Sequence, residues 1–137
     1  MRRRALLASV LATPALAQTP WPDRPARFIN PFTAGSAVDV VTRLIAADMS
    51  ERLGQQFIVE NRTGASGNIG TEAVARARPD GLTLLVGSPG TMGINPFLFR
   101  TLPYDAVRDF AAVSHAVSFP QVMVVNPNGP IRSLADL

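Results

Sequence analysis

Three short apolar segments of the chain are each followed by a turn of small residues and then by a segment with helical character. The turns read PFTAGSA (turn one, residues 31–37), TGASGNIG (turn two, residues 63–70) and GSPGTMG (turn three, residues 87–93). Regular alternation of strand and helix is typical of right-handed βαβ units with parallel strands. We therefore expect an α/β fold with a doubly wound, mainly parallel sheet.

The expected elements follow from the spacing of apolar residues. The longest helix should cover residues 37–53, where apolar side chains recur every three or four positions, and Gly54 follows at a site suited to a left-handed cap. The last helical segment has only begun where the sequence stops, which indicates a fragment of a longer protein. Strands are expected at residues 26–30, 57–61, 82–88, 111–118 and 121–127, and shorter helical segments at residues 71–78 (stopped by Pro79 and Gly81), 89–99 and 133–137.

The first 17 residues have the composition of a secretory signal peptide. A basic start, MRRR, precedes an apolar run that is too short to cross a bilayer, and residues 15–17 form an A-x-A cleavage site. Cleavage after Ala17 would remove Arg2, Arg3 and Arg4, so the formal charge of +3 falls to about zero. The sequence therefore predicts export to the periplasm, by the general or the twin-arginine route.

The amino-acid composition excludes several classes of protein. No basic stretch with interleaved aromatic residues remains after the leader, so we expect no nucleic-acid partner. The chain has no cysteine, so an exported form must depend on its apolar core rather than on disulfides. About 120 residues after the leader suffice for one modest domain. No second apolar run is long enough for a membrane span.

Each of the three turns leads from a strand into a helix, where backbone N–H groups lack partners and the helix dipole is positive. Small residues let an anion approach these groups, and the hydroxyls of Thr33, Ser36, Ser88 and Thr91 add donors. The turns therefore indicate an anion site built from the main chain. Two purely structural roles stay open for the same residues: the glycines can serve tight turns and close packing, and Ser36 with Asp39 has the spacing of a capping box.

Other chemistry has little support in the sequence. Neither glycine-rich turn follows the G-x-G-x-x-G pattern of dinucleotide sites, and no P-loop follows. We find no metal-ligand spacing and no G-x-S-x-G elbow, so neither a metal nor a cofactor is expected. His115, the sole histidine, is expected to be a packed or edge-strand side chain, and Met92 and Phe97 to line the core or a pocket.

Several motifs in order resemble a known family: P-F-x-A-G ending in Asp, VENRTGASGNIG, ARARPDGLTLL, INP and LPYDAVRDFAAVS. From about Trp21 to Leu137 the chain is similar to the periplasmic substrate-binding receptors of tripartite tricarboxylate transporters, also called Bug receptors. The resemblance implies a two-lobed, flytrap-like receptor, not an enzyme, that delivers a small carboxylate to a membrane permease. After the signal peptide at residues 1–17, it implies the first lobe at 18–125 and the crossover and start of the second lobe at 126–137, with the rest of the second lobe absent.

Carried over by motif, the resemblance also implies which residues bind the carboxylate through amides, hydroxyls and waters. The full-length receptor is expected to be a monomer. The alternatives are an exported α/β enzyme, such as a hydrolase with its catalytic residues further along the chain, and a ligand-binding partner of a membrane sensor. The implied site residues are Phe32, Thr33, Ala34, Gly35, Ser36 and Asp39 of the first turn and its helix, Gly67 and Asn68 of turn two, and Ser88, Gly90 and Thr91 of turn three.

Overall fold

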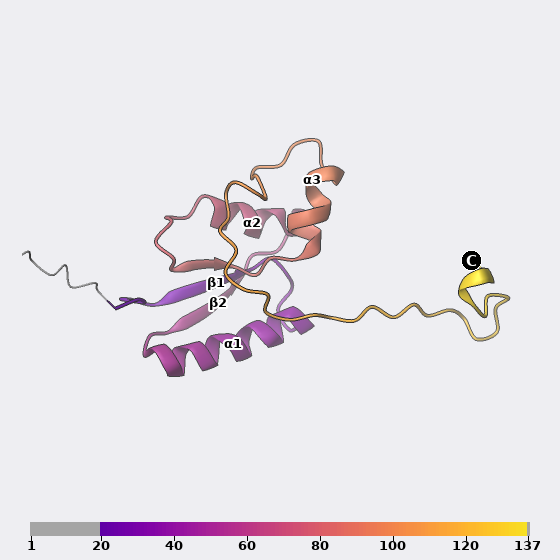
Figure 1. Ribbon diagram of the computed structural model, residues 1–137, viewed down its shortest axis with the longest axis horizontal. Coiled ribbons are helices and arrows are strands. Elements are labelled where there is room, and N and C mark those ends of the chain that lie inside the picture. The colour runs from indigo at the N-terminus through magenta and orange to yellow at the C-terminus, as the bar shows by residue number, and fades with distance from the viewer. Residues whose placement is uncertain (1–19, 137) are drawn as a thin grey trace, which may run out of the picture.

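Three parallel strands form the centre of the computed structural model, which describes residues 20–136 (Figure 1). The strands are β1 (Ala26–Asn30), β2 (Phe57–Asn61) and β3 (Thr83–Leu85), and their order across the sheet is β2-β1-β3. The central strand pairs in parallel with both neighbours. The α/β class and the parallel sheet expected from the sequence are confirmed, whereas the predicted signal peptide lies outside the described residues.

Helix α1 (Ala37–Leu53) has the bounds that its apolar spacing predicts. Ser36 caps its start, with its hydroxyl accepting from the N–H of Asp39, and Gly54 ends it in the left-handed conformation. The helix packs on β1 and β2 and lies below the sheet in Figure 1. Ala46 of this helix joins Ala26, Phe57 and Leu82 in the buried core.

Helix α2 (Asn68–Ala75) covers the other side of the sheet, against β1 and β3 (Figure 1). A helix on each face is the doubly wound arrangement, because β1–α1–β2 and β2–α2–β3 run in opposite directions across the sheet. The helix begins three residues earlier than expected, after a 3-10 turn, η1 (Ala65–Gly67), and ends well before Pro79. A proline disfavours helical conformation in the residue before it, so Pro79 sets a limit at Arg78, and the observed end at Ala75 lies within that limit.

Beyond β3, which is shorter than the expected strand at 82–88, turn three forms a π-helix, η2 (Gly90–Ile94), followed by α3 (Asn95–Leu98). The predicted helical segment at 89–99 is thus confirmed. Phe97 is 92% exposed, so its expected place in the core is wrong, while Met92 is half-buried. A single 3-10 turn, η3 (Leu134–Asp136), stands where the helix at 133–137 was expected.

Residues 111–128 extend away from the sheet with nearly every side chain exposed (Figure 1). The strands expected at 111–118 and 121–127 are wrong for this structure, because neither segment pairs with a neighbour within residues 20–136. Apolar and β-branched composition gives a strand only where another strand completes its hydrogen bonds. His115 is accordingly exposed in an extended segment rather than packed.

Candidate functional site

The three turns meet at one edge of the sheet, because the parallel strands all end there. The order β2-β1-β3 reverses direction at β1, so the carboxyl ends of β1 and β3 flank the topological switch point. In open α/β sheets this is the crevice in which ligands bind. Turn one, after β1, and turn three, after β3, are therefore the two turns best placed to contact a ligand.

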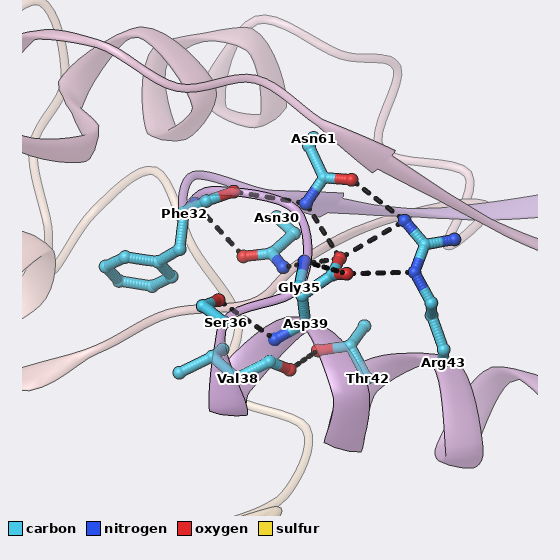
Figure 2. Close-up of polar contacts among 9 residues, drawn as sticks. All are labelled: Asn30, Phe32, Gly35, Ser36, Val38, Asp39, Thr42, Arg43 and Asn61. Carbon is cyan, nitrogen blue, oxygen red and sulfur yellow. Dashed lines mark hydrogen bonds and ion pairs between the residues drawn. The ribbon is translucent and has the colours of Figure 1, made fainter.

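Three polar side chains, those of Asn30, Asp39 and Asn61, hold turn one in place, and a fourth, Arg43, contacts Asp39 and Asn61 (Figure 2). Asn30 accepts from the N–H of Phe32 at 3.1 Å, and Asn61 donates to the carbonyl of Phe32 at 3.1 Å. Asp39 accepts from the N–H of Gly35 at 2.9 Å. The backbone on either side of Thr33 and Ala34 is thus fixed at three points. We call Asn30, Asp39, Arg43 and Asn61 the turn-one cluster.

Asp39 is the centre of this cluster. Its side chain is only 3% exposed, and Arg43 grips it with two donors, at 2.9 Å from Nε and 3.2 Å from Nη2. Asn61 and Asn30 donate to its Oδ1 at 2.8 Å and 3.2 Å. Hydrogen bonds from Arg43, Gly35 and Asn61 hold the pKa of the Asp39 carboxyl well below its usual range.

The capping prediction for Ser36 and Asp39 is confirmed for Ser36 only. The Ser36 hydroxyl accepts from Asp39 N–H at 3.3 Å, but the Asp39 carboxylate bonds to Gly35 N–H rather than returning to Ser36. Within residues 20–136, the Asp39 carboxylate accepts hydrogen bonds only from the turn-one cluster and from turn one itself. This carboxylate therefore stabilises the conformation of the turn.

The exposed part of turn one offers main-chain donors. Thr33, Ala34 and Gly35 are exposed, and within residues 20–136 the N–H groups of Thr33 and Ala34 have no acceptor at hydrogen-bond distance. The first two N–H groups of α1, from Ala37 and Val38, also lack intrahelical acceptors. These groups, at the positive end of a helix of 17 residues, favour an anion.

In turn three, Ser88 and Thr91 cap each other. The N–H of Ser88 donates to Thr91 Oγ1 and the N–H of Thr91 donates to Ser88 Oγ, both at 3.2 Å. Thr91 is 1% exposed, whereas Ser88 and Gly90 are half-buried and closer to solvent. Thr91 therefore supports the turn, and Ser88 and Gly90 are the members that a ligand can reach.

Turn two is packed between the other two turns. A Cβ on Gly67 would lie 2.7 Å from Thr91 Cγ2 and 3.4 Å from Pro31 Cβ, and the φ of Gly67 is +89°. Only glycine satisfies both conditions without a shift. The packing role expected for a glycine is therefore confirmed for Gly67, which packs against Pro31 of turn one and Thr91 of turn three.

The side chain of Asn68 also links turn two to turn three, through hydrogen bonds. Its Oδ1 accepts from Asn95 Nδ2 at 2.7 Å and lies 2.9 Å from the hydroxyl of Tyr104, which is also 2.8 Å from the carbonyl of Thr91. Asn68, Asn95 and Tyr104 are all buried. This buried network fixes turn two against turn three and leaves the side-chain oxygen of Asn68 already engaged.

The sequence-predicted residues thus fall into two groups. Phe32, Thr33, Ala34, Gly35, Ser36, Ser88 and Gly90 lie at the accessible edge, whereas Asp39, Gly67, Asn68 and Thr91 are buried beneath it. Sequence reasoning missed Asn30, Arg43, Asn61, Asn95 and Tyr104. One available signal was Arg43, four residues after Asp39 on the same helix, the spacing of an ion pair.

The part of the chain that the structure describes gives little support for a metal site or a catalytic site. Residues 20–136 contain no group of three His, Cys, Asp or Glu side chains that could hold a metal ion. Ser118 Oγ lies 3.5 Å from His115 Nε2, which is too long for an effective hydrogen bond, and both residues are exposed. A shallow hollow of about 210 Å³ lined by Trp21, Arg24 and Asp80 lies at the opposite edge of the sheet.

No helix within residues 20–136 has both the length and the apolar character that crossing a membrane requires.

Comparison with known proteins gives a consistent result. Residues 41–137 match the model of the tripartite tricarboxylate transporter family receptor. A UPF0065 protein of Bordetella bronchiseptica is 39% identical over 100% of this chain, and the chain spans 42% of that relative.

Two solved structures are similar in fold and sequence. MatC of Rhodopseudomonas palustris, with bound malate, is 43% identical with a TM-score of 0.63, and the match covers 66% of this chain and 31% of MatC. A second R. palustris protein, solved with adipate, is 44% identical with a TM-score of 0.61, and the match covers 63% of this chain and 29% of that protein. The likeness therefore concerns less than half of each similar protein.

Proposed function

Because the chain belongs to the tripartite tricarboxylate transporter receptor family, we propose that it forms the first lobe of an exported receptor for a small organic carboxylate. The similar chains solved with malate and adipate both contain dicarboxylates, which supports this ligand class. The receptor would deliver its ligand to the membrane permease of a tripartite transporter. No reaction is assigned to the site.

The observation that carries the proposal is the set of turn-one amides that have no acceptor within residues 20–136, at the switch point beside turn three. A carboxylate oxygen accepts several hydrogen bonds at once, and the N–H groups of Thr33 and Ala34 have no acceptor in the part of the chain that the structure describes. The start of α1 adds its dipole. A site of this kind holds an anion without a cationic side chain in contact with it.

Each site residue then has a proposed role. Thr33, Ala34, Ser36, Ser88 and Gly90 would donate to the carboxylate. Phe32 and Gly35 would shape the rim. The remaining residues of the expected site, namely Asp39, Gly67, Asn68 and Thr91, would hold these donors in position, since each is buried.

The division of the chain into a leader at residues 1–17, a first lobe at 18–125 and a crossover from 126 is part of the proposal. Residues 111–128 would then find partners in a second lobe, which accounts for their exposed apolar side chains, including Val122, Met123 and Val124. Mass spectrometry of periplasmic protein should give a mature N-terminus at Gln18. An intact leader on that protein would contradict cleavage after Ala17, and absence of the protein from the periplasm would contradict export.

Calorimetric titration tests the ligand class directly. The chain, with any residues that follow Leu137 in its gene, is titrated with malate, adipate and citrate, and with glucose as a neutral control. The proposal predicts saturable heat with at least one carboxylate and none with glucose. Binding of glucose alone, or of no carboxylate at all, would overturn it.

A further inference from the structure

The turn-one cluster places a negative charge behind the edge at which an anion is proposed to bind. Asp39 is buried, and it accepts from the backbone of Gly35 within turn one itself. A carboxylate in this position repels a second carboxylate, and the repulsion is stronger in the protein than in water. An anion site on turn one therefore needs the charge of Asp39 to be cancelled.

Arg43 is the one cation in contact with that charge among residues 20–136. Its side chain is 51% exposed, and it also donates to Asn61 Oδ1 at 3.0 Å, so it is held on the far side of Asp39 from Gly35 (Figure 2). The two-pronged contact fixes both oxygens of the carboxylate. Arg43 is thus placed to neutralise Asp39 without touching a ligand on turn one.

We propose that Asp39 and Arg43 act as a positioning pair for the carboxylate site. Asp39 fixes the main chain of turn one through Gly35, and Arg43 cancels the charge that would otherwise repel the ligand. This inference rests on the proposed function. It assigns Arg43 to anion affinity although Arg43 lies outside the binding edge.

The test compares substitutions of Arg43 by calorimetric titration with malate and adipate at low and high ionic strength. Arg43→Gln leaves Asp39 unneutralised, so affinity should fall by about tenfold at low salt, and the defect should shrink in about 0.5 M salt, where repulsion is screened. Arg43→Lys keeps the charge and should recover most of the affinity. The double variant Asp39→Asn/Arg43→Gln is again neutral and should bind better than Arg43→Gln alone.

Arg52→Gln is the matched control, because Arg52 forms an i,i+4 pair with Asp48 at 2.8 Å on the same helix and is exposed. It should leave affinity within about twofold of the natural chain. Thermal unfolding of every variant separates loss of affinity from loss of fold. Salt and Arg43→Lys separate the two roles of the side chain: a purely structural role gives a loss of affinity that salt does not relieve and that Arg43→Lys shares.

The outcomes are distinguishable. If the unsubstituted protein binds neither malate, adipate nor any other carboxylate, the proposed function fails and this inference fails with it. If the unsubstituted protein binds and Arg43→Gln binds equally well, or its defect is independent of salt, the positioning pair alone is overturned.

Discussion

Asn30 and Asn61 are register partners at the ends of β1 and β2, and they hold the two backbone polar groups of the same residue, Phe32. The Asn30 side chain accepts from the Phe32 N–H and the Asn61 side chain donates to the Phe32 carbonyl, at 3.1 Å in both cases. The end of the sheet is thereby tied to the start of turn one. The position of the exposed amides of Thr33 and Ala34 depends on this pairing.

Asn61→Ala should destabilise the fold by about 1–3 kcal/mol, because it leaves the Phe32 carbonyl and one oxygen of Asp39 with fewer partners. Urea unfolding followed by circular dichroism measures the change. Asn128→Ala is the control, since Asn128 is exposed in a turn remote from the sheet and should change stability by less than about 0.5 kcal/mol. Equal effects of the two substitutions would show that Asn61 has no special role.

Gly67→Ala should cost about 2–4 kcal/mol, because the new Cβ combines a positive φ with a contact 2.7 Å from Thr91 Cγ2. Gly93→Ala tests the same change in the neighbouring π-helix, where a Cβ meets nothing within 4 Å, and should be close to neutral. Thermal melts of both variants make the comparison. A neutral Gly67→Ala would contradict the tight junction of the three turns.

Tyr104→Phe removes the hydroxyl that reaches Asn68 and Thr91 but keeps the ring, which packs edge-on against Phe110 at 6.0 Å. We expect a loss of about 0.5–1.5 kcal/mol in the free energy of unfolding. Tyr104→Ala, which also removes the buried ring, should cost about 3–5 kcal/mol. Urea unfolding of both variants gives the two values. If both substitutions cost the same, the hydrogen bonds rather than the ring carry the stability.

Asp39 should give the protein a specific acid sensitivity. Its pKa is lower in the folded chain than the ordinary value of about 3.9, so its contribution to stability is complete above about pH 5 and is lost as pH falls further. The free energy of unfolding, measured from pH 7 to pH 3, should decline more steeply for the natural chain than for Asp39→Asn below pH 5. Parallel pH profiles of the two proteins would contradict the low pKa.

Much of the fold follows from local sequence patterns. The helix at Ala37–Leu53, the glycine cap at Gly54 and the strands at Ala26–Asn30 and Phe57–Asn61 occur where apolar spacing and turn chemistry predict them. The meeting of the three turns also follows, because parallel strands end at one edge. The strands expected at 111–118 and 121–127 do not form, since composition cannot supply a pairing partner.

The contacts behind the site were less accessible to sequence reasoning. Asn61 and Asn30 meet Phe32 only because the register of β1 and β2 sets them side by side. Tyr104 reaches Asn68 across 36 positions of sequence, and no local pattern encodes such a contact. The spacing of Asp39 indicated a helix-start residue, whereas its burial under turn one depends on the folded sheet.

The most direct test of the whole account is a titration of ¹⁵N-labelled protein with malate or adipate, followed through backbone amide resonances. The amides of Thr33, Ala34, Ala37, Val38 and Gly90 should shift together and saturate, while those at the far end of α1, near Leu53, stay unchanged. Saturable shifts clustered away from turns one and three, or none at any carboxylate concentration, would contradict a main-chain anion site at this edge of the sheet.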